Sequence, residues 1–199
     1  MVKLYLDIDK LYLDIETYRK DPFKDEKVIA IGVSEGEGRI EKFLEWELGD
    51  EKGVIKEFYS YIFDLMEEED FLVVVGFGIL RFDIPLLIQK GVEYGYSLSE
   101  LNAFWHRTFT IDLFQSMLPA YNFRYKGNSL ENLVKEAERF GVSIELYGSG
   151  REVRNWYENG EYQKIESHLE ADLEAIRQID LNGIVIKILK EKLLSVKQV

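Results

Sequence analysis

The chain has 199 residues, 46% of them hydrophobic, which is enough to build the core of one domain. Its formal net charge of −12 argues against a general electrostatic attachment to nucleic acid or to an anionic membrane, so an anionic substrate would need local basic groups and bound metal. The absence of cysteine excludes disulfides, thiolate zinc sites and cysteine nucleophiles, and with only two histidines a metal must be held mainly by oxygen, which favours Mg²⁺ or Mn²⁺.

Residues 11–18 alternate between aliphatic and polar side chains, as in a strand with one apolar face. The polar face carries Asp14 and Glu16, which lie roughly 6.5 to 7 Å apart if they are two residues apart on one strand. Two carboxylates at this distance can share a divalent metal, and they repel each other without it. Taken alone, however, an Asp-x-Glu pair is more simply interpreted as a solvated strand face.

The hexapeptide KLYLDI occurs twice, at residues 3–8 and 10–15. The spacing of seven is odd, so in one continuous strand Asp7 and Asp9 would face away from Asp14 and Glu16. Only the second copy runs on into Glu16. We therefore assign the acidic pair to the second copy and treat the first as an extension or a start-site duplication.

Further strands are predicted at residues 27–34 and 39–46, where they form an antiparallel meander with the first strand. Apolar residues at helical spacing predict a helix over residues 54–65, and the continuous apolar run at 71–77 is typical of a buried central strand. A meander followed by alternating helices and strands predicts an α/β fold, with a mixed central sheet flanked by helices.

The segment GFGILRFDIPLLIQKG, residues 76–91, follows that central strand. Asp83 precedes a helical pattern with Pro85 in its first turn, which fits a simple helix N-cap. A carboxylate at the mouth of a central strand also stands where α/β folds bind ligands. The sequence leaves both roles of Asp83 open.

Between residues 102 and 128 the charge balance becomes basic and aromatic residues are frequent, and FTIDLF at 109–114 predicts a strand that runs into a helix. Such a mixture suits a nucleic-acid single strand, because bases stack on aromatic rings while cations contact phosphates. Two segments are polar enough to be binding loops, residues 121–128 and 147–157. Their candidate nucleic-acid contacts are Arg124, Tyr125, Lys126, Arg151, Arg154 and Trp156.

A helix is expected over residues 129–140, then a strand or extended connection at 141–148, and a last long helix that begins near Glu161. The long helix has an apolar stripe formed by Ile165, Leu169, Leu173 and Ile176. His168 and Asp172 are four residues apart and share another face. By itself this pair is typical of a surface ion pair.

Three motifs therefore follow one another along the chain: D-I-E-T on a first strand, G-F-(x)4-F-D-I-P after a central strand, and H-(x)3-D on a late helix. This order resembles the DEDD superfamily of 3′–5′ exonucleases, and most closely the proofreading exonuclease domain of family B DNA polymerases, over about residues 10–185. The resemblance implies a ribonuclease H-like fold. It also implies that the four metal-binding acids are Asp14, Glu16, Asp83 and Asp172.

Two positions depart from the polymerase pattern. The polymerases usually have Asn where Gly78 stands, and they have Tyr where His168 stands; other branches of the superfamily use His one residue further away. No palm, fingers or thumb segment accompanies the motifs, so the chain resembles a free-standing exonuclease.

The resemblance implies a reaction as well. Two Mg²⁺ or Mn²⁺ ions about 3.5 to 4 Å apart would be held by Asp14, Glu16 and Asp172, with Asp83 acting directly or through water. His168 would orient and deprotonate the attacking water. The expected activity is 3′–5′ hydrolysis of single-stranded DNA. The alternatives are a single-stranded DNA-binding protein with the same fold and little turnover, and an RNA exonuclease or ribonuclease H-type endonuclease.

The expected partner is the 3′ end of a single-stranded nucleic acid, with DNA favoured over RNA, and beyond it a second copy of the chain or an unspecified replication or repair protein. No apolar run reaches the ~18 residues of a membrane span, and residue 1 leads into a strand pattern rather than a signal peptide. We therefore expect a cytoplasmic protein without a membrane partner, built as a single domain over residues 1–199.

Overall fold

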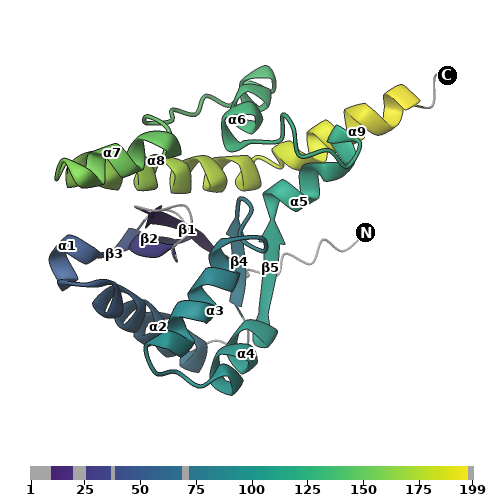
Figure 1. Ribbon diagram of the computed structural model, residues 1–199. Coiled ribbons are helices and arrows are strands. Elements are labelled where there is room, and N and C mark those ends of the chain that lie inside the picture. The colour runs from purple at the N-terminus through teal and green to yellow at the C-terminus, as the bar shows by residue number, and fades with distance from the viewer. Residues whose placement is uncertain (1–9, 20–25, 37–38, 69–71, 197–199) are drawn as a thin grey trace.

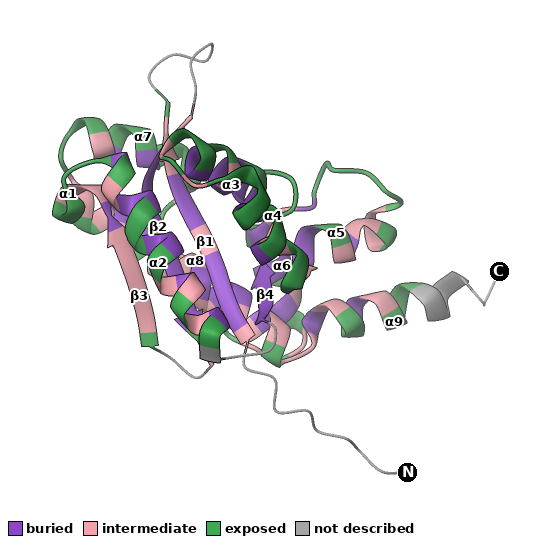
Figure 2. Cartoon of the chain, turned by 90° about the horizontal axis from the view of Figure 1, so that it is seen from below, coloured by how far each residue is buried: buried purple, intermediate pink, exposed green. Residues whose placement is uncertain are grey.

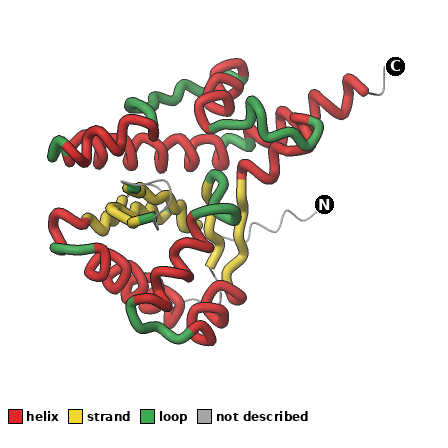
Figure 3. Tube along the Cα trace, viewed as in Figure 1, coloured by secondary structure: helices red, strands yellow, loops and turns green. Residues whose placement is uncertain are grey.

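A five-stranded mixed sheet separates two layers of helices (Figures 1 and 3). The computed structural model describes residues 10–19, 26–36, 39–68 and 72–196, so the first KLYLDI copy lies outside the described residues. The strands are β1 (Lys10–Tyr18), β2 (Lys27–Glu35), β3 (Arg39–Leu44), β4 (Leu72–Gly76) and β5 (Thr108–Asp112). Their order is β3-β2-β1-β4-β5, antiparallel from β3 to β1 and parallel from β1 to β5. The predicted α/β fold with a mixed sheet is confirmed.

The helices form one layer on each face of the sheet. The layer below the sheet in Figure 1 contains α2 (Glu51–Glu68), α3 (Asp83–Glu93) and α4 (Leu98–Arg107), and the layer above it contains α6 (Leu130–Arg139), α7 (Gly150–Glu158) and α8 (Tyr162–Leu181). The remaining helices are α1 (Glu45–Leu48), α5 (Leu113–Met117), the 3₁₀ helix η1 (Leu118–Tyr121) and α9 (Ile184–Val196). Since α5, η1 and α8 all contact α9, this group closes one end of the upper layer.

Strand β1 lies at the centre of the sheet and is largely buried (Figure 2). Leu11, Leu13 and Ile15 belong to the core shared with α2 and α3, whereas Tyr12 belongs to the core shared with α8. The alternation seen in the sequence therefore separates two cores, one on each face of the sheet. Asp14 and Glu16 lie on the same face as Tyr12, below α8.

Helix α8 approaches the sheet closely because residue 32 of β2 is a glycine. A Cβ atom added at Gly32 would lie 2.6 Å from Leu173 Cδ1, so the absence of a side chain allows the leucines of α8 to contact the strand directly. The predicted stripe is confirmed, since Ile165, Leu169, Leu173 and Ile176 are all fully buried. This contact brings the next face of α8, with His168 and Asp172, to the end of β1.

One expected segment differs from the structure. Residues 150–158 form helix α7 rather than a loop, because the Ser149 side chain caps the helix and Val153 is buried beneath it. Residues 142–147, for which a strand or an extended connection was expected, form a connection without helix or strand pairing among the described residues. Ile188 of α9 is buried in the same core cluster as Leu173 of α8. No helix in the described part of the chain is long and apolar enough to cross a membrane.

Candidate active site

An acidic cavity opens between the end of β1 and helix α8. Its volume is about 230 Å³. Asp14 and Glu16 line it from β1, and His168 and Asp172 line it from α8. The pairing of β1 with β2 shifts its register between Glu16 and Thr17, so an irregularity of the strand follows the acidic pair directly. Two of the three motifs thus meet in one cavity, although more than 150 residues separate them in the sequence.

The orientation of His168 follows from its hydrogen bond to the main chain. Its Nδ1 atom lies 2.7 Å from the carbonyl oxygen of Tyr147, and because a carbonyl only accepts, Nδ1 must carry the hydrogen and donate it. Nε2 then lies 3.5 Å from Glu16 Oε1, while Nδ1 is 3.8 Å from Asp172 Oδ1. The side chain is only 5% exposed, so His168 is a buried residue of the site and not a surface ion-pair partner.

Asp83 does not cap the helix that it begins. Helix α3 starts at Asp83 itself, the preceding residue Phe82 occupies the N-cap position, and no side chain there accepts a capping hydrogen bond. The Asp83 side chain is buried, and its charge raises the pKa of both Asp14 and Glu16, which places it beside the β1 acids. The ordinary structural role that the sequence left open for Asp83 is therefore excluded.

The acids of the site have perturbed pKa values with a common cause. Burial, followed by the charges of Glu16, Asp172 and Asp83, raises the pKa of Asp14 well above its usual range. Burial and the neighbouring acids likewise raise the pKa of Glu16. Burial, then the charge of Asp112, raises the pKa of Asp83 to about 7, and burial raises that of Asp172 to about 6 although His168 opposes the shift. Such a group of carboxylates favours a cation or protons among them.

The carboxylates are a suitable donor set for a hard divalent cation, because all their ligand atoms are oxygens and their mutual repulsion would be relieved by positive charge. In the conformation described, no three of the described His, Asp or Glu side chains already surround a common metal position.

Asp83 should tolerate replacement by asparagine without loss of folding. Because it caps nothing, Asp83→Asn removes a repelling charge while conserving shape, so the melting temperature without metal should stay the same or rise. Any metal-dependent activity of the cavity should fall by about ten- to a hundredfold, the scale on which support of a metal site is lost. Asp64→Asn, an exposed acid on α2, is the matched control. Full activity in Asp83→Asn would remove this residue from the site.

Two further acids near the site, Asp112 and Glu131, belong to none of the three sequence motifs. Asp112, at the end of β5, accepts hydrogen bonds from the backbone N–H groups of Gly78 and Leu80, at 2.9 and 3.1 Å, and so fixes the loop that leads to Asp83. Glu131 lines the cavity from the first turn of α6 and raises the pKa of Asp172. Both positions depend on tertiary contacts, although a buried-strand aspartate such as Asp112 is in itself an unusual residue.

The candidate nucleic-acid residues fall into two groups. Tyr125 is 60% exposed, and its ring lies 4.3 Å from the guanidinium carbon of Arg81, while Arg124 and Lys126 are exposed on the same loop. On α7, Arg151 is exposed and Arg154 pairs with Glu158 at 3.1 Å. Trp156 is only 6% exposed, which contradicts its expected role as an exposed stacking residue.

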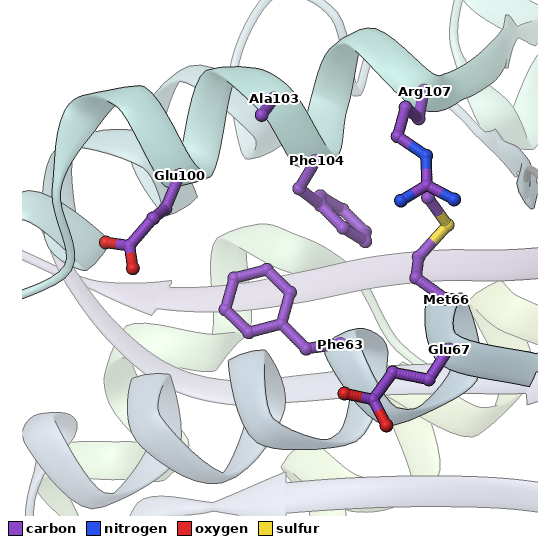
Figure 4. Close-up of a pocket in the computed structure, with 7 residues that line it drawn as sticks. All are labelled: Phe63, Met66, Glu67, Glu100, Ala103, Phe104 and Arg107. Carbon is purple, nitrogen blue, oxygen red and sulfur yellow. The ribbon is translucent and has the colours of Figure 1, made fainter.

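A larger cavity of about 410 Å³ lies on the other side of the sheet, between α2 and α4 (Figure 4). Phe63 of α2 and Phe104 of α4 face each other there, with their ring centroids 5.5 Å apart. The cavity is also lined by Met66, Glu67, Glu100, Ala103 and Arg107. None of the motif acids lines it, so we assign the chemistry to the smaller, acidic cavity.

Known proteins share both the sequence family and the fold. The sequence model of the RNase H superfamily matches residues 11–181. The family B DNA polymerase from the hyperthermophilic archaeon Pyrobaculum calidifontis matches with 20% identity and a TM-score of 0.67, over 88% of this chain and 24% of the polymerase. The zinc-bound E. coli exonuclease I complex with single-stranded DNA matches with 15% identity and a TM-score of 0.57, over 96% of this chain and 43% of that one.

The same exonuclease in complex with a dT13 oligonucleotide matches with 15% identity and a TM-score of 0.54, over 96% of this chain and 42% of that one. No curated protein matches the sequence. The chain thus spans less than half the length of either matched protein. The expected resemblance and the ribonuclease H-like fold are confirmed, and a nuclease-type fold carries the acidic cavity. The chain belongs to the RNase H superfamily.

Proposed function

We propose that this protein is a metal-dependent exonuclease that hydrolyses single-stranded DNA from its 3′ end. The observation that carries the proposal is the convergence of Asp14, Glu16, Asp172 and His168 on one cavity, with Asp83 buried beside them. A pure binding protein has no need for buried carboxylates that repel one another and the phosphate backbone. Catalysis through metal ions gives each of them a role.

Asp14, Glu16 and Asp172 would hold the metal, and Asp83 would act on it directly or through water. Two divalent ions, when bound, supply charge that stabilises the attacking and leaving oxygens of the phosphate. Glu131, at the rim, would exclude phosphate groups from the part of the cavity nearest α6.

His168 would act as the general base. With Nδ1–H donated to the Tyr147 carbonyl, Nε2 is the nitrogen that can accept a proton from a water in the cavity. The main-chain hydrogen bond keeps the ring from turning, so the accepting nitrogen stays on the side of Glu16. A histidine suits this task because a neutral imidazole can donate from one ring nitrogen while the other accepts a proton.

The loop of Arg124, Tyr125 and Lys126 supports a single strand as the substrate. Its two cations are exposed in a chain of net charge −12, and its tyrosine is largely exposed although Arg81 and Phe114 lie against the ring. Unpaired bases can stack on such a ring, whereas paired bases cannot reach it. The matched E. coli exonuclease structures contain single-stranded DNA and a dT13 oligonucleotide, which favours DNA over RNA.

Alanine substitutions should separate stacking from charge in this loop. In an Asp83→Asn background, where cleavage is suppressed, Tyr125→Ala should weaken single-strand binding by roughly 1 to 3 kcal/mol. Arg124→Ala or Lys126→Ala should instead reduce the slope of log affinity against log salt by about one. Fluorescence anisotropy with a labelled oligonucleotide measures both. Lys52→Ala, on the opposite helical layer, is the charge-matched control, and equal behaviour of all four variants would assign the loop to packing.

The proposed function is tested with end-labelled single-stranded and duplex DNA and RNA, incubated with Mg²⁺ or Mn²⁺ and resolved by length. The proposal requires a ladder that shortens by single nucleotides from the 3′ end, on single-stranded DNA above all. Internal cuts would indicate an endonuclease, and preferred shortening of RNA would indicate an RNA exonuclease. Tight binding without products would indicate a single-stranded DNA-binding protein. Any of these three results would overturn the proposal.

A further inference from the structure

Trp156 is buried against two groups, the imidazole of His168 and the peptide that accepts the hydrogen bond of that imidazole. The centroid of the indole lies 5.9 Å from that of the His168 ring, and the two planes make an angle of 73°, so the rings meet edge to face. Trp156 belongs to α7 and His168 to α8, and both side chains are almost completely buried.

The second group is the peptide that accepts the Nδ1–H hydrogen bond. This peptide joins Tyr147 to Gly148, and Gly148 has a φ of +64°, a conformation that other residues rarely adopt. A Cβ atom on Gly148 would lie 2.4 Å from Cη2 of Trp156, so the backbone there rests directly on the indole. The Tyr147 ring contacts the same indole, with 6.1 Å between centroids.

We propose that Trp156 is a positioning residue for His168: one indole supports both the imidazole and the carbonyl that holds it, and so keeps Nε2 directed at Glu16 and the cavity. This inference rests on the proposed function, in which Nε2 accepts the proton of water. It replaces the expectation that Trp156 stacks on a base. Without the indole, the Tyr147–Gly148 peptide can turn. The imidazole then loses its contact with the indole and its hydrogen bond to the Tyr147 carbonyl.

If Trp156 had a purely structural role, its replacement would have a different effect. The indole also packs on Ile29, Val153 and Ile165, and a residue that serves only this cluster would affect stability without affecting the histidine. Trp46 provides the comparison, because it stacks on Tyr162 at 4.7 Å beside the same cluster and contacts neither His168 nor Tyr147. Trp46→Ala is therefore the matched control for Trp156→Ala.

The orientation of His168 can be observed without turnover. The chain has only two histidines, and His106 is exposed at the end of α4, so nitrogen-15 labelling of histidine gives two sets of NMR signals. His106→Gln assigns them. Wild type and Trp46→Ala should show a slowly exchanging Nδ1–H for His168, and Trp156→Ala should lose it. An unchanged His168 signal in Trp156→Ala would overturn the positioning role, whether or not the protein is a nuclease.

Kinetics give the second readout. Trp156→Ala should lower kcat by about ten- to a hundredfold, as expected when a reacting group is misplaced by about 1 Å, and should leave KM unchanged. Trp156→Phe should recover most of the loss. In a His168→Ala background, Trp156→Ala should have no further effect, because its target is gone. An equal decrease of kcat in the wild-type and His168→Ala backgrounds, or an increase of KM without a decrease of kcat, would contradict the proposal.

The test does not depend on one variant. If Trp156→Ala unfolds below the assay temperature, Gly148→Ala is the second variant. Its methyl group would clash with the Trp156 indole, which should separate the indole from the Tyr147–Gly148 peptide and also release the His168 Nδ1–H. A retained signal in a folded Gly148→Ala would overturn the inference. A wild-type chain that releases no nucleotides would overturn the proposed function instead, and the NMR comparison would still decide the role of Trp156.

Discussion

Replacing His168 by alanine should lower kcat by about a hundred- to ten-thousandfold at saturating metal, the usual contribution of a general acid–base group. The expectation follows from the placement of Nε2, which has Glu16 as its neighbour and no backbone partner among the described residues, whereas Nδ1 is held by Tyr147. The variant should still bind metal and single strands, because it removes no carboxylate. Rates of wild type and variant at saturating metal, with metal and single-strand binding measured on the same samples, test this.

The variant His168→Tyr distinguishes orientation of the water from removal of its proton. Tyrosine stands at this spacing in the family B polymerase pattern, and its hydroxyl can orient water although it is a poor base near neutrality. Partial recovery relative to His168→Ala would indicate that orientation contributes most. Near wild-type rates for His168→Ala would show that metal ions alone activate the water, and that the histidine has no catalytic role.

The metal-free protein should lose stability as the pH rises from about 4 to about 7. Unfolded aspartates release their protons near pH 3.9, whereas folded Asp172 and Asp83 keep theirs until their pKa values of about 6 and about 7. Within that window the folded state binds more protons than the unfolded state, so the free energy of unfolding decreases with pH and the loss is complete above the folded pKa values. Each unit by which a folded pKa exceeds the unfolded pKa costs about 1.4 kcal/mol. Asp172, with a pKa of about 6, and Asp83, with a pKa of about 7, should therefore together cost on the order of 7 kcal/mol.

Divalent metal should reverse this loss. A ligand that binds only the folded state adds about 2.7 kcal/mol at one hundred times its dissociation constant, and the effect should be largest at alkaline pH, where all the carboxylates are charged. Melting temperatures at about pH 5 and pH 8, with chelator or with Mn²⁺, test both statements. Asp14→Ala is the control that should respond least. Equal melting temperatures with and without Mn²⁺ in wild type and Asp14→Ala would show that the acids do not form a metal site.

The sequence predicted the site where local pattern determines structure. Strand alternation placed Asp14 and Glu16 on one face, and helical spacing placed His168 beside Asp172, because these relations depend only on residues a few positions apart. The role of Asp83 could not be decided in this way. An N-cap and a first-turn residue differ by one position in the start of a helix, and the loop held by Asp112 determines that start.

The prediction failed at Trp156 for a related reason. The glycines and charges of residues 147–157 are typical of a loop, and no local pattern reveals that α8 lies against this segment and buries the indole. Glu131 enters the cavity only because α6 begins beside it. In each case, an element distant in the sequence determines whether a polar or aromatic residue faces solvent, a core or the site.

The contact of Leu173 with Gly32 has a consequence for the timing of activity during synthesis. A ribosome releases the chain from its N-terminus, so β1 to β5, with Asp14, Glu16 and Asp83, emerge well before α8. Until α8 docks on β2, the cavity lacks both Asp172 and His168, and the nascent sheet cannot perform the proposed cleavage. A growing chain therefore completes the candidate site only after α8, residues 162–181, has left the ribosome and docked on β2.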